Sequence, residues 1–362
     1  MKAFAMLAAA TVALAACGGD SKSAATDTTK VATTGTAVSS GVDLTGAGAT
    51  FPNPLYTKWF SDYAAKTGVK INYQSIGSGG GIRQLTEGTV DFGASDAPMS
   101  DAEIAKLKGP VLHIPTVLGA VVITYNVPGV ASGLKLTGPV IVDIFSGKIT
   151  KWNDSRVASI NTGAKLPASD IVVVHRSDGS GTTYIFSDYL AAVSPAWATS
   201  PGKGKELQWP VGLGGKGNEG VAGQVKQTPG TIGYVELVYA KQNKLAYASV
   251  KNAAGEFVEP SVGSITAAAA SAVAALAPTT DYRVSIVNAA GQGVYPISSF
   301  TYLLVPQTIA DAAKGKKLVD FLHWAMTEGE AAASPLDFAP LPPALVTQLN
   351  QRINTIKLGS AQ

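Results

Sequence analysis

The chain has 362 residues, of which 46% are hydrophobic and 15% are charged, and this length suits about two globular domains with their own cores. Its 28 basic and 25 acidic residues leave a net charge of +3, without the strong basic excess of a nucleic-acid-binding protein. No stretch approaches the ~20 apolar residues that a membrane-spanning helix needs. Nucleic-acid-binding and membrane-spanning proteins are therefore poor matches for this composition.

The first 41 residues differ from the rest of the chain. Residues 1–16 have the layout of a signal peptide, because Lys2 precedes an apolar stretch that is too short to span a membrane. Cys17, the only cysteine, follows directly, as in the bacterial lipobox, where the cysteine is lipidated and becomes the mature N-terminus. Residues 17–41 are mostly small and polar, which predicts a flexible tether. We therefore expect an exported protein, in the periplasm or at the cell surface, anchored to the membrane by a lipid at Cys17.

From residue 42 onward, short β-rich runs alternate with helical patterns, and this alternation predicts an α/β fold. The predicted strands are residues 70–74, 90–94, 121–125 and 171–174. A helix after residue 52 is expected to bury one aromatic face, because four aromatic residues follow the spacing i, i+3, i+4 and i+7. These residues are Tyr56, Trp59, Phe60 and Tyr63.

Three further helices are predicted along the chain. Ser100 and Glu103 form the pattern of a capping box for a short helix over residues 101–108. The alanine-rich residues 266–277 predict a helix on the surface. Residues 308–327 give the longest amphipathic pattern, and its clustered lysines are expected to form a solvated face.

Three short turns rich in Gly, Ser and Thr each come before a predicted helix. They are residues 46–52 (GAGATFP), 77–81 (GSGGG) and 176–183 (RSDGSGTT), and in the first of them Thr50 is a good N-cap candidate. The first N–H groups of a helix have no partner within it, and the helix dipole adds partial positive charge there. Such a turn can hold a phosphate-like oxyanion. One turn of this kind is ordinary, but three in one chain indicate a shared anion site.

Arg176 and Asp178 add charge to the third of these turns, and Asp96 is a further charged candidate outside them. Arg176 offers a planar fork of donors to a tetrahedral oxyanion, and Asp178 is close enough in sequence to orient it. The alternative for this pair is a surface ion pair of little worth. Asp96 follows an apolar strand, and its alternative is an ordinary turn aspartate. Beside an anion, Asp96 would favour phosphate, which keeps a proton to donate near neutral pH, over sulfate, which keeps none.

At these residues the sequence closely resembles the periplasmic phosphate-binding proteins of bacterial high-affinity phosphate ABC importers. The main matching stretches are TGAGATFPNP at 45–54, NYQSIGSGGG at 72–81, TVDFGASDA at 89–97 and RSDGSGT at 176–182. Three more stretches fit the same family, namely FSGKITKWND at 145–154, GKGNEGVA at 215–222 and GTIGYVE at 230–236. The likeness covers nearly everything from about residue 42 onward.

The resemblance implies a type II periplasmic-binding-protein fold, with two hinged lobes and phosphate buried in the cleft between them. The first lobe would comprise residues 42–115 and 295–362, and the second would be an insertion of residues 116–294. Carried over position by position, the phosphate ligands of the first lobe are Thr50, Phe51 through its backbone N–H, Ser78 and Asp96. Those of the second lobe are Arg176, Ser180, Gly181 and Thr182, with Asp178 supporting Arg176.

The implied function is the capture of inorganic phosphate and its delivery to the permease subunits of an ABC importer. The family works as a monomeric binding protein and not as an enzyme, and it needs neither a cofactor nor a metal. The closed state of such a protein is stabilised only when the ligand is present, because each lobe supplies half of the ligand contacts.

Three other classes of protein compete with this hypothesis. A secreted phosphatase is disfavoured, because the three histidines lack metal-ligand spacing and neither Ser78 nor Ser180 lies in a G-x-S-x-G motif. A receptor for sulfate or molybdate is disfavoured by Asp96. A scaffolding surface lipoprotein would leave the three glycine-rich turns unexplained.

Overall fold

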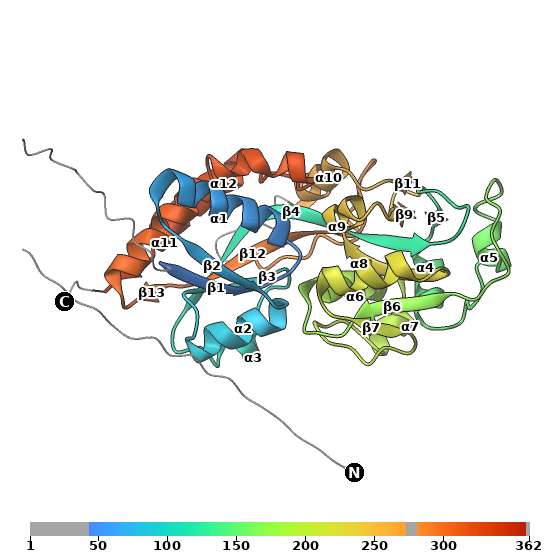
Figure 1. The fold of residues 1–362 in the computed structure, drawn as a ribbon, viewed down its shortest axis with the longest axis horizontal. Helices are drawn as coiled ribbons and strands as arrows, with labels where there is room; N and C mark the ends of the chain where they lie inside the picture. The colour runs from blue at the N-terminus through green and yellow to red at the C-terminus, as the bar shows by residue number, and fades with distance from the viewer. Residues whose placement is uncertain (1–42, 273–280, 360–362) are drawn as a thin grey trace, which may run out of the picture. The chain divides into compact units, whose positions relative to one another are not determined.

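The structure is a computed structural model that describes residues 43–272 and 281–359. The predicted signal peptide, Cys17 and the tether lie outside these residues, as does the end of the alanine-rich segment. Within the described part, strands and helices alternate along the chain (Figure 1), so the α/β prediction is confirmed. In this part of the chain, no helix is long and apolar enough to cross a membrane.

Nine strands in the described residues form one mixed sheet, in the order β2-β1-β3-β12-β4-β8-β6-β7, with β9 paired to β4. They are β1 (Leu44–Gly48), β2 (Ile71–Ser75), β3 (Phe92–Ser95), β4 (Val111–Asn126), β6 (Val172–Arg176), β7 (Leu213–Gly215), β8 (Thr231–Glu236), β9 (Ala246–Tyr247) and β12 (Ser298–Pro306). Two smaller sheets contain β5 (Lys135–Leu136), β10 (Ser249–Lys251) and β11 (Phe257–Val258), and β13 (Thr308–Ile309) with β14 (Lys357–Leu358). The four predicted strands overlap β2, β3, β4 and β6, and are confirmed.

The large sheet has two parts that share the strand β4. In the first part β1 is parallel to β2 and β3, and in the second β6 is parallel to β7 and β8. β4 changes partner along its length, because residues 111–120 pair with β12 and residues 121–126 pair with β8, both in antiparallel fashion. Nearly all of β4 is buried, as expected of a strand covered on both faces.

Helices lie on both parts of the sheet (Figure 1). The α-helices are α1 (Asn53–Thr67), α2 (Ser78–Glu87), α3 (Asp101–Ile104), α4 (Gly138–Phe145), α5 (Ser155–Ala158), α6 (Gly181–Val193), α7 (Pro195–Thr199), α8 (Gly217–Gln227), α9 (Leu237–Gln242), α10 (Val262–Ala272), α11 (Ala312–Ala325) and α12 (Pro343–Ile353). Two short 3-10 helices, η3 (Gly329–Ala332) and η4 (Ser334–Leu336), precede α12. Three of these helices, α2, α6 and α8, follow a strand of one of the two parallel groups, with one to four residues between strand and helix.

Helix α1 confirms the predicted aromatic face. Its four aromatic residues are all buried, and the rings of Tyr56 and Trp59 stack with their centroids 5.6 Å apart. The indole N–H of Trp59 also donates to the carbonyl of Gly329 at 2.6 Å, which ties the helix to η3. Gly68 ends α1 with φ near +79°, a left-handed conformation that glycine adopts without steric cost. The apolar spacing and the glycine stop therefore fix this helix from the sequence alone.

Two helix predictions were too long. The capping box of Ser100 and Glu103 is present, but α3 ends at Ile104 and turns follow up to residue 109. Helix α11 begins at Ala312, because residues 308–309 form β13 and pair with β14 instead. It is also shorter than α1, so residues 308–327 do not form the longest helix.

The predicted solvated face of α11 and surface position of α10 are confirmed, because Lys316, Thr266 and Ala270 are exposed, but both helices also make contacts that the sequence does not predict. Lys314 and Lys317 on α11 pair with Asp91 at 3.0 Å and Asp43 at 2.5 Å, so they tie the helix to the first part of the sheet. Helix α10 begins at Val262, and Ala268 and Ala269 are buried where it packs against β4 and β12. Small alanine side chains permit this close packing, which helix propensity alone does not predict.

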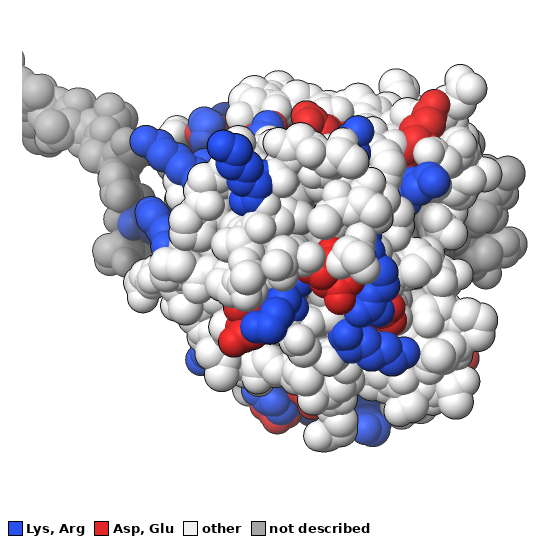
Figure 2. All heavy atoms as spheres, turned by 90° about the vertical axis from the view of Figure 1, so that its right-hand side faces the viewer, with Lys and Arg blue, Asp and Glu red and all other residues white. Residues whose placement is uncertain are grey.

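The face turned toward the viewer in Figure 2 carries charges of both signs. It is the end of the molecule where α5 lies in Figure 1, and its basic side chains lie beside acidic ones. The ion pairs Arg156–Asp143, Arg156–Asp154 and Lys151–Asp170, each at 2.9 Å, belong to this region of the chain. Because the charges are interspersed, this face offers no continuous basic surface to a nucleic acid.

Candidate oxyanion-binding site

The first group of candidate residues follows the carboxyl ends of β1, β2 and β3. Because these strands are parallel neighbours, their carboxyl ends meet at one edge of the sheet, where α/β proteins commonly bind ligands. Thr50 and Phe51 follow β1, Ser78 opens α2 after β2, and Asp96 follows β3. All four are buried, with at most 2% of their surface exposed. The prediction that Thr50 caps α1 is wrong, because Pro52 holds the cap position and no side chain caps the helix.

The second group lies at the carboxyl ends of the parallel strands β6, β7 and β8. Arg176 ends β6, Asp178 lies in the following turn, and Ser180 caps α6 by accepting from the backbone N–H of Thr183 at 3.0 Å. Gly181 and Thr182 are the first two residues of α6, and both are buried. The start of a 13-residue helix, with its unpaired N–H groups, therefore lies beside a buried guanidinium.

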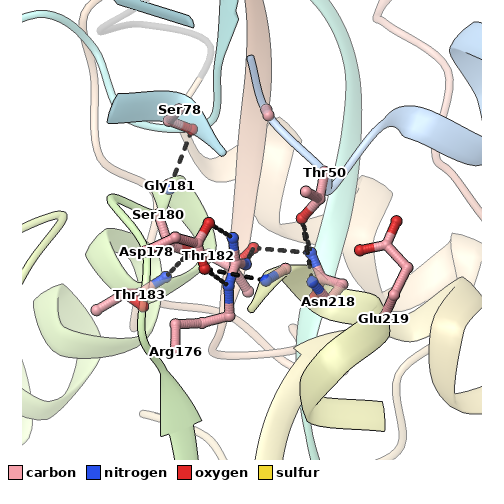
Figure 3. A network of polar contacts seen from close by, with 12 residues as sticks. Thr50, Ser78, Arg176, Asp178, Ser180, Gly181, Thr182, Thr183, Asn218 and Glu219 are labelled. Atoms are coloured by element: carbon pink, nitrogen blue, oxygen red, sulfur yellow. Dashed lines mark hydrogen bonds and ion pairs between the residues drawn. The ribbon is translucent and has the colours of Figure 1, made fainter. Parts of the chain in front are cut away.

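The two groups contact each other directly (Figure 3). The hydroxyl of Ser78 accepts from the N–H of Gly181 at 3.0 Å, and the N–H of Gly79 donates to the carbonyl of Gly179 at 2.8 Å. A side chain at Gly181 would bring its first carbon within 2.5 Å of Asp96 Oδ2 and 2.6 Å of Ser78 Oγ. Glycine is therefore required at position 181 for the two groups to meet at this separation.

Arg176 is held in a fixed orientation by Asp178. Its Nε and Nη2 donate to the two oxygens of that carboxylate at 2.8 and 2.6 Å, which is the bidentate geometry of a strong ion pair. Burial raises the pKa of Asp178, but the hydrogen bonds and the charge of Arg176 outweigh this, and the pKa lies below its ordinary value. Asp178 therefore stays ionised and neutralises part of the charge on Arg176, while Nη1 lies 3.3 Å from the hydroxyl of Thr182.

Asp96 is a buried carboxyl group beside this cation. Burial raises its pKa to about 7, against the opposing effects of a hydrogen bond from Thr301 and the positive charge of Arg176. The hydroxyl of Thr301 on β12 donates to Oδ1 at 2.8 Å. Near neutral pH, Asp96 can therefore exist either as an acceptor or, when protonated, as a donor.

Ser78 illustrates how the site directs hydroxyl protons. Its Oγ accepts from two backbone N–H groups, those of Gly181 at 3.0 Å and of Asp96 at 3.3 Å. A hydroxyl group has two acceptor lone pairs and one proton, so both lone pairs of Ser78 are engaged and only its proton remains available. Ser78 is thus a donor toward any further partner, which suits an anion.

Sequence reasoning missed three residues that the structure brings to this site. Asn218 at the start of α8 and Thr301 on β12 hydrogen-bond to Thr50 and Asp96, and Glu236 at the end of β8 hydrogen-bonds to Asn218 through its backbone. A signal for Asn218 was present, because the glycine-rich residues 214–217 precede it at the junction of β7 and α8. Thr301 lies within a buried strand and carries no local signal of a site.

Glu236 is a second buried acid, and it gives a test of the electrostatics. Burial raises its pKa well above the ordinary value of 4.5, one oxygen accepts from the N–H of Val238 at 2.7 Å, and the other is unpaired in the described residues. When the pKa of a carboxyl group is higher in the folded protein than in the unfolded chain, the protein loses stability as the pH rises above the pKa of the unfolded chain. We expect Glu236→Gln to unfold at a higher temperature than the wild type at pH 8, with a gain of at least about 1 kcal/mol.

Thermal unfolding between pH 4 and pH 8 checks this expectation. The advantage of the glutamine variant should shrink toward pH 4, where both forms of the chain carry a neutral group at position 236. Glu87→Gln, at an exposed position on α2, is the matched control and should change little at either pH. A gain of equal size at pH 4 and pH 8 would contradict the electrostatic explanation.

Comparison with known proteins identifies the class and then the family. A model described as the PBP superfamily domain matches residues 21–327, so the chain belongs to the PBP superfamily. Phosphate-binding protein PstS of Xylella fastidiosa (strain Temecula1) is 49% identical over 309 residues, which cover 85% of this chain and 84% of the relative. PstS of Pasteurella multocida (strain Pm70) is 46% identical over 313 residues, which cover 86% of this chain and 90% of the relative. At these identities the chain belongs to the family of the PstS proteins.

Solved structures support the same fold. A periplasmic phosphate-binding protein bound with phosphate at pH 8.5 matches with a TM-score of 0.68 and 24% identity, over 88% of this chain and 100% of the other. A phosphate-binding protein from Stenotrophomonas maltophilia matches with a TM-score of 0.63 and 23% identity, over 86% and 94%. The chain therefore has the type II periplasmic-binding-protein fold, and this prediction is confirmed.

Proposed function

We propose that this protein captures inorganic phosphate between two lobes and delivers it to the permease of an ABC importer. The observation that carries the proposal is the juxtaposition of a buried guanidinium, Arg176, and two helix starts with a buried carboxyl group, Asp96. Such a set offers many donors to an oxyanion and one group that can accept its proton. The protein is a binding protein and not an enzyme, as its membership of the PstS family implies.

The proposed ligands of phosphate come from both parts of the sheet. They are Thr50, Phe51 through its backbone N–H, Ser78, Asp96, Arg176, Ser180, Gly181 and Thr182, with Asp178 orienting the guanidinium. The hydrogen bond from Gly181 to Ser78 supports this set, because it joins the two groups at 3.0 Å. No metal takes part in this proposal, and the described residues hold no cluster of three metal-ligating side chains.

The two lobes of the proposal are residues 42–115 with 295–362, and residues 116–294. The pairing of β4 supports such a division, because the strand changes partner from β12 to β8 between Ala120 and Val121. The backbone carbonyl of Ile297 also accepts from the N–H of Val121, so the two crossings of the chain lie side by side. Rotation about these crossings would open the cleft and expose the ligands.

The protonation state of the ligand explains why phosphate is the preferred anion. Phosphate keeps at least one proton near neutral pH, and ionised Asp96 can accept it. Sulfate has no proton there, so it would place an acceptor against an acceptor in a buried site, and buried sites reject such ligands strongly. A receptor that prefers sulfate would be expected to present donors alone.

The proposal extends to the location of the protein. Export by a signal peptide over residues 1–16 and lipidation of Cys17 would keep the protein at a membrane surface, where the permease subunits are. The segment 17–41 would act as the tether. We propose that the protein works as a monomer, with no cofactor.

Calorimetric titration of the full chain, dialysed free of phosphate, tests this function. We expect tight binding of phosphate at pH 8 and binding of sulfate that is weaker by at least about a thousandfold. Chloride serves as a control for charge alone and should give no heat. Equal binding of phosphate and sulfate would indicate a general oxyanion receptor, and no binding of either would favour a scaffolding lipoprotein.

A further inference from the structure

Asn218 hydrogen-bonds to residues of both groups of the site (Figure 3). It is the second residue of α8 and is completely buried. Its side-chain amide nitrogen lies 2.7 Å from the hydroxyl of Thr50 and 3.2 Å from the hydroxyl of Thr182. One amide group therefore bonds to a proposed phosphate ligand from each group.

The hydrogen-bond partners of Asn218 fix which way its amide points. Its Oδ1 accepts from the backbone N–H of Glu236 at 2.9 Å. That N–H is a donor, so the oxygen of the amide must face it and the NH2 group must face the two threonines. The backbone of β8 thus sets the orientation of Asn218, and both amide protons are directed into the site.

Thr50 becomes a donor as a consequence. Its Oγ1 accepts from the Asn218 side chain at 2.7 Å and from the Asn218 backbone N–H at 3.2 Å. These two bonds engage both acceptor lone pairs of the hydroxyl, so its proton is the only hydrogen-bonding capacity that remains. Within the described residues, this proton is donated to no other protein group.

Thr182 is in the same situation in the opposite group. Its Oγ1 accepts from Arg176 at 3.3 Å and from Asn218 at 3.2 Å, and its proton likewise has no protein acceptor in the described part of the chain. The two threonine hydroxyls therefore present protons and no lone pairs. An anion with several acceptor oxygens is stabilised by such a pair, whereas a neutral ligand that needs acceptors is not.

We propose that Asn218 is a positioning residue that turns the hydroxyls of Thr50 and Thr182 into donors for the anion and joins the two groups when the ligand is bound. Asn218 does not contact the anion itself and acts on it only through these two hydroxyl groups. The proposal rests on the proposed function, because it assigns both threonines as phosphate ligands. It implies that the contribution of Asn218 to affinity depends on the presence of the two hydroxyl groups.

A mutant cycle in the full chain tests this dependence by calorimetric titration with inorganic phosphate. We expect Asn218→Ala to weaken phosphate binding by about tenfold to a hundredfold, because two neutral hydrogen bonds are no longer directed. In a chain that also carries Thr50→Val and Thr182→Val, the same change should weaken binding by less than about threefold. A residue that merely fills space would cost the same in both backgrounds.

Asn126→Ala is the matched control. Its amide also bonds to α8, at the backbone carbonyls of Val225 and Lys226 at 2.9 and 3.1 Å, but at the far end of the helix. We expect it to leave the affinity for phosphate within about twofold of the wild type, whatever its effect on thermal unfolding. A loss of affinity as large as that of Asn218→Ala would attribute the effect to the stability of α8 and overturn the inference.

The outcomes separate this inference from the function on which it rests. Binding by the wild type with equal losses in both backgrounds overturns the positioning role and leaves phosphate binding intact. A wild-type chain that binds no phosphate overturns both. Thermal unfolding without phosphate checks that each variant is folded, and Asn218→Ser replaces the alanine variant if that chain does not fold, with the same coupling expected.

Discussion

Replacing Arg176 with alanine is expected to weaken phosphate binding by about a hundredfold to several thousandfold. The guanidinium is almost completely buried and is the one cation that hydrogen-bonds to the proposed ligands within the described residues. Truncating one member of a buried charged pair costs about 2 to 5 kcal/mol, largely because the other charge is left without its partner. Here the remaining charge is that of Asp178, which would then repel the incoming anion.

Two further variants separate the charge of Arg176 from its geometry. Arg176→Lys keeps a positive charge but cannot donate in parallel to both oxygens of Asp178, so we expect an affinity between those of the wild type and the alanine variant. Arg156→Ala is the matched control, because Arg156 also pairs with two aspartates but lies at the surface on α5. It should leave binding unchanged.

Calorimetric titration of the three variants with phosphate at pH 8 gives the affinities. A lysine variant as tight as the wild type would show that charge alone matters and that the planar fork does not. An alanine variant within about threefold of the wild type would remove Arg176 from the set of ligands, and the assignment of the whole second group would then fail.

The sequence predicts much of this molecule because its signals are local. The aromatic spacing of α1, the capping box at Ser100 and the glycine-rich turns at residues 77–81 and 176–183 each specify a short segment. Five of the eight ligand candidates lie in these two turns, and the structure brings all eight to the carboxyl ends of two groups of parallel strands. These candidates were carried over from a family resemblance, which supplied the arrangement that the local signals lack.

What the sequence does not reveal depends on distant partners. Residues 111–120 of β4 were not predicted, because His113, Pro115 and Gly119 interrupt the apolar run, and a proline argues against a central strand. Thr301 and Asn218 belong to the site only because β12 lies beside β3 and β7 lies beside β6. The start of α11 was misjudged for a similar reason. Residues 308–309 form β13, which pairs with β14 near the end of the chain, so the helix can begin only after them.

The second large effect is expected at Asp96, in the discrimination between phosphate and sulfate. Burial raises the pKa of this carboxyl to about 7. Above pH 7 the group is ionised and can only accept, so it repels sulfate. Below pH 7 it is protonated and can donate to sulfate as it could to any anion. The affinity of the wild type for sulfate should therefore rise by about tenfold for each pH unit from pH 9 down to pH 7, and then level off.

Asp96→Asn should abolish this pH dependence, because an amide keeps its donors at every pH. At pH 8 we expect the variant to bind sulfate more tightly than the wild type and phosphate more weakly, so that the ratio of the two affinities falls by at least about a hundredfold. Titrations of both anions at pH 6, 7, 8 and 9 measure this ratio.

Asp91→Asn is the matched control, because Asp91 precedes β3 at the end opposite to Asp96 and pairs with Lys314. It should leave the ratio unchanged. Sulfate binding to the wild type that is independent of pH would show that Asp96 does not face the anion, and rejection of sulfate would then have to arise from another group. A variant that keeps the full preference for phosphate would lead to the same conclusion. Together, the pH slope and its loss in Asp96→Asn would show that a single buried proton distinguishes the two anions.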